Sequence, residues 1–419
     1  MPEEVRRRTR DGKEIMQLTQ QIRIQPTEAQ EDVLNVLSEK CRLIYNFALE
    51  ERKKAFEEEH KQISYIEQQN QLPKTKEEYP EYTWVYSKVL QSTLRALDAD
   101  FKSFYALKKN GDESARPPKF KGKRYFTTMV YNQSGFKFGE GWARFSHKHP
   151  SKTELEFDIP EKFSFDTVKQ VSIYKKYGDF YISVTYEEEE QEYVDNGQYQ
   201  AFDLGVLKHT AVNSKGKTIE FTNKRPDRYW EDKISAVQSK RDLCKKDSRR
   251  YKRYDRALKR MKRKCADQMK DFQHKLSRKI VDNTKSNTII VGDLSVKDMC
   301  SQNKYQKGLH TSLHNTGHIG RFVRFLTYKA RLVGKRVVEI DERKTSKRCC
   351  VCGSEQDMPI HKRTYECGDC GSEMDRDENS SINIMSRYLS QNGLWTAYQR
   401  FVDNLRQTGI AIQEQALYS

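Results

Sequence analysis

The stretch QAFDLGVLKHTAVNSKGKTIEF, residues 200–221, decides the fold of this chain. It contains three short runs rich in apolar residues, and a Ser-Lys-Gly turn separates the second run from the third. This pattern predicts three adjacent β-strands joined by tight turns. The first of these strands carries an acid, Asp203, inside an otherwise apolar run.

The residues that follow extend this pattern to an α/β domain. Helical periodicity comes next, then a hydrophobic strand at 288–291, a helix at about 318–334 and a strand at 336–340. Three strands in a meander, followed by helices that alternate with further strands, predict the RNase H type of α/β fold.

The N-terminal part of the chain has a different texture. Residues 17–24 alternate as a strand, and Thr27 is placed to cap a helix. The helical pattern continues with interruptions to about residue 109, and short alternating runs then occupy 117–192. The clearest of these runs is a hairpin of 171–174 against 180–186. The pattern predicts a β-domain that a helical insertion interrupts near its start.

Composition limits the classes of protein that this chain can belong to. The 419 residues carry a formal net charge of +17, from 77 Lys and Arg against 60 Asp and Glu. No apolar run approaches the ~18 residues that a membrane span needs, and the N-terminal MPEEVRRRTRDGKE lacks the apolar core of a secretion signal. We therefore expect a cytoplasmic protein with no membrane partner, and the positive charge favours a polyanionic partner.

Positive charge is concentrated in residues 231–280, which hold 19 Lys and Arg but only 7 Asp and Glu. Apolar residues recur there at helical spacing, which predicts an amphipathic helical hairpin that breaks near Asp247. A solvated surface helix or a coiled-coil arm would also explain it, but the density of Arg with interleaved Tyr favours contact with nucleic-acid phosphates. The candidate contacts are Arg249, Arg250, Lys252, Arg253, Arg256, Lys259 and Arg260.

A second basic and aromatic stretch, RPPKFKGKRYF, runs from Arg116 to Phe126. Its two prolines are also typical of a domain linker, and a basic linker can itself lie against nucleic acid. Its candidate contacts are Lys119, Lys121 and Arg124.

Five of the nine cysteines fall between Cys349 and Cys370. Two Cys-x-x-Cys pairs, Cys349 with Cys352 and Cys367 with Cys370, are separated by 14 residues. This spacing predicts a structural zinc site, because four thiolates saturate the ion and leave no open position for catalysis. The alternative is a ribbon that has lost its metal, and four intact cysteines argue against it.

Several motifs together identify a family. They are QPTEAQEDVLNVLSEKCRLIYNFALEERKKAF, AFDLGV, FQHKLSRKIVDNTKSNTIIVGDLSVKDM, TSKRCCVCG and DRDENSSINI, and they occur in this order along nearly the whole chain. The sequence closely resembles TnpB, the transposon-encoded RNA-guided nuclease that is related to the small type V CRISPR effectors.

The resemblance implies an α/β multidomain protein that has a guide RNA and a double-stranded target DNA as partners. The DNA would be read by base pairing with the RNA, and a short adjacent motif would be read by the protein. The implied domains are an N-terminal tail and first wedge strand (1–26), a helical recognition insertion (27–115), a wedge β-barrel (116–197), an RNase H-like RuvC domain with long basic helices (198–345), a zinc ribbon (346–374), and the C-terminal part of RuvC with a tail (375–419).

The resemblance also suggests where the adjacent motif of the DNA is read, although ordinary helix and strand positions would explain the same residues. The candidates for this contact are Tyr45, Lys53, Ser87, Gln91, Thr127 and Thr128.

Members of the family cut DNA with three RuvC carboxylates that hold two Mg²⁺ ions. Matched motif by motif, the first is Asp203 and the third is Asp377, but Gly292 stands where the family has a glutamate. Asp293 belongs to the motif in its own right, and its neighbouring position in the strand would point it to the opposite face. The loss of one anionic ligand of three predicts a strong loss of cleavage.

We therefore expect an inactivated nuclease that binds Zn²⁺ structurally and for which Mg²⁺ is possible but not catalytic. Such a protein would bind DNA through its guide RNA and act as a transcriptional repressor. Two explanations for Gly292 besides natural loss stay open, namely an engineered substitution and a divergent but active site. The alternative functions are an active TnpB-type, Mg²⁺-dependent endonuclease and a guide-independent zinc-containing DNA-binding protein. The sequence leaves the oligomeric state open.

Overall fold

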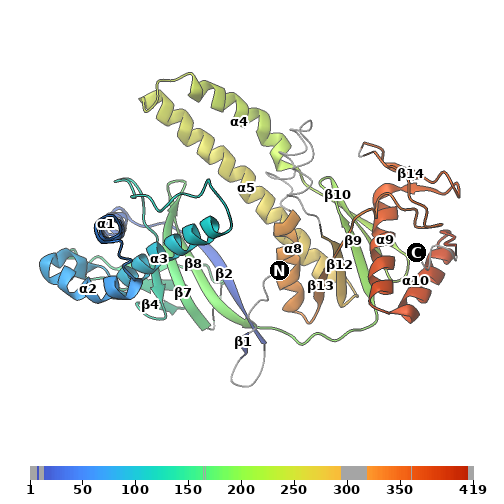
Figure 1. Cartoon of the computed structure of the whole chain (residues 1–419), viewed down its shortest axis with the longest axis horizontal. Coiled ribbons are helices and arrows are strands. Elements are labelled where there is room, and N and C mark those ends of the chain that lie inside the picture. Colours follow the sequence, from blue (N-terminus) through green and yellow to red (C-terminus); the bar gives the residue numbers. More distant parts are fainter. Residues whose placement is uncertain are drawn as a thin grey trace. The chain divides into compact units, whose positions relative to one another are not determined.

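The structure is a computed structural model that describes residues 7–8 (backbone), 14–163, 165, 167–293, 319–359 and 361–413. The chain divides into two compact units, Met1–Glu188 and Glu189–Ser419 (Figure 1). Both units combine helices and strands, which confirms a mixed α/β multidomain protein. Among the described residues, no helix is both long and apolar enough to cross a membrane.

The N-terminal unit begins with a strand that leads into a helical segment. Its helices are α1 (Glu28–Glu59), α2 (Tyr65–Glu78), the 3₁₀ helix η1 (Pro80–Trp84) and α3 (Ser87–Lys109). Thr27 caps α1 as predicted: its hydroxyl accepts a hydrogen bond from the backbone N–H of Gln30, and the Gln30 side chain accepts one from the backbone N–H of Thr27. Such a reciprocal cap fixes the point at which the helix starts.

Two sheets complete this unit. The strands are β1 (Arg7–Arg8), β2 (Glu14–Ile24), β3 (Met129–Asn132), β4 (Phe136–Gly139), β5 (Trp142–Phe145), β6 (Leu155–Asp158), β7 (Thr167–Lys176) and β8 (Asp179–Glu189). They form one sheet in the order β1-β2-β8-β7-β3 and a second in the order β4-β5-β6. The antiparallel pair β7–β8 is the hairpin that the sequence predicts, whereas the β-barrel stays a prediction.

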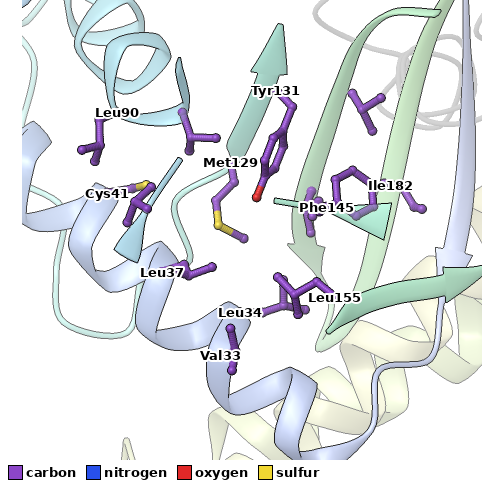
Figure 2. Packing of buried hydrophobic residues seen from close by; sticks show 14 of the residues in the cluster. Val33, Leu34, Leu37, Cys41, Leu90, Met129, Tyr131, Phe145, Leu155 and Ile182 are labelled. Atoms are coloured by element: carbon purple, nitrogen blue, oxygen red, sulfur yellow. The ribbon is translucent and has the colours of Figure 1, made fainter. Parts of the chain in front are cut away.

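One hydrophobic core joins the helices of this unit to its strands. Leu34 and Leu37 of α1, Leu90 of α3, Met129 of β3 and Ile182 of β8 belong to one cluster of buried residues (Figure 2). The helical segment is therefore packed on the strands and shares their core.

The C-terminal unit is built on a five-stranded sheet. Its elements are β9 (Tyr199–Leu204), β10 (Lys208–Asn213), β11 (Thr218–Thr222), α4 (Pro226–Asp242), α5 (Arg249–Asn283), β12 (Thr288–Gly292), α8 (Ile319–Arg331), β13 (Arg336–Ile340), β14 (Thr364–Glu366), β15 (Glu373–Asp375), α9 (Arg376–Gln391) and α10 (Trp395–Gln407). The sheet order is β11-β10-β9-β12-β13. β9, β10 and β11 pair antiparallel as the predicted meander, and β12 pairs parallel with both β9 and β13.

The two faces of this sheet pack against different helices. Ala201 of β9 and Ile290 of β12 share a core with α9 and α10, whereas Phe202 and Ile289 share a core with α5 and α8. Successive residues of a strand point to opposite faces. Asp203 and Gly292 therefore belong to the face that α9 covers, and Figure 1 shows α9 beside β9.

The predicted helical hairpin is formed by α4 and α5, which lie side by side in Figure 1. The chain turns at Asp247, whose φ of 63° lies in the left-handed region, and Ser248 then caps α5. The break is therefore where the sequence predicts it.

Candidate active site

Asp203 and Asp377 approach one another at the end of the sheet. Asp203 is the fifth residue of β9 and faces α9, and Asp377 lies in the first turn of α9. Asp375 caps this helix, because its Oδ1 accepts hydrogen bonds from the backbone N–H groups of Asp377 (2.9 Å) and Glu378 (3.2 Å). The cap fixes the helix start and so fixes the position of the Asp377 side chain.

The space beside Gly292, which a side chain at this position would enter, holds the carboxylate of Glu342. A Cβ built on Gly292 would overlap a carboxylate oxygen of Glu342 and would lie 2.9 Å from its Cβ. The parallel pairing of β12 with β13 brings this about, since Gly292 lies opposite Ile340 and Glu342 follows two residues later. Glu342 therefore occupies the space that a side chain at position 292 would otherwise enter.

The acidic side chains of this cluster influence one another. Burial first, and then the negative charges of Asp377 and Glu342, raise the pKa of Asp203 to about 8. Burial, followed by the charges of Asp293 and Asp341, raises the pKa of Glu342 to about 7. Acids placed together with raised pKa values are typical of a site that binds cations.

Three basic groups compensate Asp377 in the metal-free protein. The nearest nitrogen–oxygen distances to its carboxylate are 3.1 Å from Arg376, 3.8 Å from Arg363 and 3.9 Å from Lys208. Lys208 also pairs with Asp375, at 3.0 Å. These cations lie beside the carboxylates, where they can also attract a phosphate.

The raised pKa of Asp203 predicts that the metal-free protein loses stability as the pH rises. The folded state retains the Asp203 proton up to about pH 8, whereas the unfolded chain releases it near its ordinary pKa of 3.8. The contribution of Asp203 to folding is therefore fully present below pH ~4 and is lost as the pH rises toward 8. We expect the melting temperature of the metal-free protein to fall by several degrees between pH 5 and pH 8.5.

Differential scanning fluorimetry in the presence of a chelator measures this pH dependence. Asp203→Asn supplies the control, because it removes the titrating group and keeps the side-chain shape. A melting curve of Asp203→Asn that falls with pH as steeply as that of the wild type would contradict the assignment.

The four predicted cysteines converge on one point. The Sγ atoms of Cys349, Cys352, Cys367 and Cys370 all lie within 4.8 Å of one another, which is compatible with a bound zinc ion. In the part of the chain that the structure describes, these cysteines alone form such a tight group of possible metal ligands. A two-metal site spreads its ligands more widely, because its ions lie about 4 Å apart.

The fifth cysteine of the ribbon, Cys350, is buried outside this group. Its Sγ lies 3.5 Å from the sulfur of Met374, and burial raises the pKa of its thiol far above the ordinary value. Cys350 is therefore a packing residue beside the cluster.

The predicted phosphate contacts on α5 are exposed. All seven basic residues from Arg249 to Arg260 named above point to solvent, while Leu258 between them is buried. The exposed basic face and the buried apolar stripe are those of the predicted amphipathic helix.

The predicted contacts in the N-terminal unit differ in exposure. Tyr45 is 2% exposed and its hydroxyl donates to Asp100 at 2.7 Å, and Thr127 is also buried. Tyr45 and Thr127 are thus buried in the structure, and their contact with nucleic acid stays a prediction. The Lys121 ammonium lies 3.6 Å from the ring centroid of Tyr45, and that of Lys53 lies 4.6 Å from Phe120. The remaining candidates, Ser87, Gln91, Lys119, Arg124 and Thr128, are exposed or half-buried.

Sequence reasoning missed Glu342. Its signal is present in the stretch Val338-Glu-Ile340-Asp-Glu342, in which every second residue belongs to one face of β13 and its extension. Recognising it requires the register between β12 and β13, which joins residues about fifty positions apart.

Comparisons with known proteins agree with this architecture. Residues 16–61 match the family described as "Helix-turn-helix domain", residues 182–303 match "Probable transposase", and residues 320–384 match "Cas12f1-like, TNB domain". In the structure, most of the first match is the single long helix α1.

Two relatives and one solved structure illustrate what this chain is similar to. A Streptomyces pristinaespiralis protein named "Putative RNA-guided DNA endonuclease" is 26% identical over 375 residues, which is 88% of each chain. The "TnpB-like protein L79" of Acanthamoeba polyphaga mimivirus is 34% identical over 156 residues, covering 37% of this chain and 29% of that protein. The structure of a Cas12f1–sgRNA–target DNA complex superposes with a TM-score of 0.57 at 12% identity, covering 85% of this chain and 83% of that one.

The likeness to Cas12f1 shows a shared fold, and the matched stretches are those of transposon-encoded and Cas12f1-like proteins. Together, the matched stretches and the relatives support a TnpB-family protein.

Proposed function

We propose that this protein is an active RNA-guided, Mg²⁺-dependent DNA endonuclease whose carboxylates are Asp203, Glu342 and Asp377. The observation that carries the proposal is the Glu342 carboxylate in the space of the missing side chain at Gly292. The strand order β11-β10-β9-β12-β13, with β9, β12 and β13 parallel, supports an RNase H-like RuvC domain. In such a sheet, the ends of adjacent parallel strands lie at one edge.

The residues at this edge fit a pair of divalent cations. Asp203, Glu342 and Asp377 supply oxygen ligands, which Mg²⁺ prefers. Bound there, Mg²⁺ would supply an activated water and neutralise the charge that develops on the scissile phosphate. Bound cations would offset the mutual repulsion that contributes to the raised pKa values of Asp203 and Glu342.

Other residues prepare the site for its substrate. Arg363 and Lys208 lie within 4 Å of the Asp377 carboxylate. These two side chains are positively charged and could therefore contact phosphate oxygens of the target strand. The Asp375 cap keeps Asp377 in place during this exchange.

Guide RNA and target DNA as partners are supported by the named function of the Streptomyces relative and by the contents of the Cas12f1 complex. The exposed basic face of α5 supplies a surface of the right charge. The four-cysteine ribbon is proposed to hold a structural zinc ion.

A second candidate function is the nuclease-dead repressor that the sequence predicts. Gly292 is the observation that favours it, because the family's glutamate is absent from β12. In that case, the protein would form a stable complex on a promoter without cutting it.

A cleavage assay with the purified protein loaded with its guide RNA tests the proposal. With Mg²⁺ and a plasmid that carries the matched sequence, we expect linearised or nicked product from the wild type. Asp203→Ala should give none, and a plasmid without the match should stay intact. RNA-dependent binding without cleavage would favour the repressor, and binding that is independent of RNA would favour a guide-independent DNA-binding protein.

A further inference from the structure

The zinc ribbon is framed by two of the three proposed catalytic carboxylates. Glu342 precedes Cys349 by seven residues, and Asp377 follows Cys370 by seven residues. The four thiols between them converge within 4.8 Å. A metal bound there closes the loop whose two ends carry Glu342 and Asp377.

The entry to the ribbon is tied to Glu342. The Thr345 hydroxyl and backbone N–H both donate to the Glu342 carbonyl, at 2.8 and 3.1 Å. The same hydroxyl lies 3.1 Å from the Ser380 hydroxyl on α9, and Ser380 is near enough to the Asp203 carboxylate to lower its pKa. A chain of contacts therefore runs from Glu342 through α9 to Asp203.

Two buried asparagines of α9 hold this entry segment. The Asn383 amide donates to the carbonyls of Thr345 (2.8 Å) and Arg348 (2.7 Å). The Asn379 amide also donates to Arg348, and its carbonyl accepts from the backbone N–H of Cys350, both at 2.8 Å. Buried amides whose hydrogen bonds are all directed at one segment fix the position of that segment.

The exit from the ribbon is tied to Asp377. In the β14–β15 hairpin, Thr364 pairs with Asp375, which then caps α9. The backbone N–H of Arg376 also donates to the Arg363 carbonyl at 2.8 Å. The two residues that precede Asp377 are thus bound to the ribbon.

We propose that the zinc ribbon is a clamp that sets the spacing between Glu342 and Asp377, with Asn379 and Asn383 as its positioning residues. The inference rests on the proposed function of these carboxylates. Zinc at the thiols and the divalent cation at the carboxylates then favour the same arrangement, so each raises the affinity for the other. Mutation of residues that orient metal ligands typically lowers metal affinity by about 10–100-fold.

Asn383→Ala in the full-length protein tests the clamp. We expect the dissociation constant for Mn²⁺, measured by electron paramagnetic resonance, to rise by about tenfold or more. The Mn²⁺ concentration that gives half-maximal cleavage should rise in parallel. Asn392→Ala is the matched control: Asn392 follows the last residue of the same helix, α9, and its amide donates only to the Tyr388 carbonyl (2.8 Å) among the bonds that the structure describes. Zinc content and guide-RNA binding report whether each variant is folded.

The readouts separate failure of the clamp from failure of the proposed function. An unchanged Mn²⁺ affinity in Asn383→Ala that keeps its zinc would overturn the clamp. A wild type that binds Mn²⁺ tightly but does not cleave would overturn the proposed nuclease and leave the Mn²⁺ comparison valid. If Asn383→Ala loses its zinc, wild-type protein stripped of zinc decides: weaker Mn²⁺ binding supports the clamp, and unchanged binding contradicts it.

Discussion

Replacing Glu342 with Gln is expected to lower the rate of target-DNA cleavage by about 10³-fold or more. The substitution keeps the size of the side chain and removes the charge that fills the space beside Gly292. Guide-RNA binding and target-DNA binding should change by less than about twofold, because the basic face of α5 is unaltered. Single-turnover cleavage at saturating protein, alongside a binding assay on uncut DNA, separates the two effects.

Glu339→Gln is the matched control for this variant. Glu339 lies on the same strand, β13, three residues earlier, and alternation assigns it to the face opposite Val338 and Ile340. The Glu339→Gln variant should cleave target DNA at nearly the wild-type rate. If Glu342→Gln cleaves at the wild-type rate, the acidic cluster works without Glu342. The proposal that Glu342 replaces the glutamate missing at position 292 would then be wrong.

Introducing a glutamate at position 292 should lower the cleavage rate unless Glu342 is removed. In Gly292→Glu, the new Cβ would overlap the Glu342 carboxylate and lie 2.9 Å from the Glu342 Cβ, a contact that side-chain rotation cannot relieve. Such overpacking costs about 1–3 kcal/mol, and the two like charges repel. We expect a lower melting temperature and cleavage at or below the wild-type rate.

The double variant Gly292→Glu with Glu342→Gly is the informative partner, because it deletes the conflicting Cβ and returns the carboxylate to β12. We expect it to cleave within about tenfold of the wild type. Measuring both variants distinguishes the two candidate functions. If Gly292→Glu alone gains cleavage that the wild type lacks, the site had lost its ligand, and the repressor is the better description.

Much of the site could be predicted from local sequence. The local sequence shows an acid inside an apolar strand at Asp203 and an acid next to the start of a helix at Asp377. Their roles as ligands came from the resemblance to the family and stay predictions. The cysteine pairs needed only their spacing, and the convergence of their thiols is confirmed. Each of these signals lies within a few residues of the functional group.

Predicting the place of Glu342 required information of a different kind, namely the pairing of two strands. Local pattern identified β12 and β13 as strands, but only their pairing, with Gly292 opposite Ile340, brings Glu342 beside the gap. The burial of Tyr45 was easier to predict from the sequence, since Tyr45 lies four residues after the buried Cys41 on the apolar stripe of α1. A likeness to other family members drew attention to Tyr45, and the helical period argued for the core.

The crowding between positions 292 and 342 has an evolutionary consequence. A lineage that exchanges one acid for the other by single substitutions must pass through a chain with both or with neither. The first is overpacked and the second lacks a ligand, so each intermediate is impaired. On the proposed function, no single substitution therefore places the carboxylate on β12 without an impaired intermediate. A survey that judges nuclease activity from the residue at position 292 alone would class proteins with this arrangement as inactive.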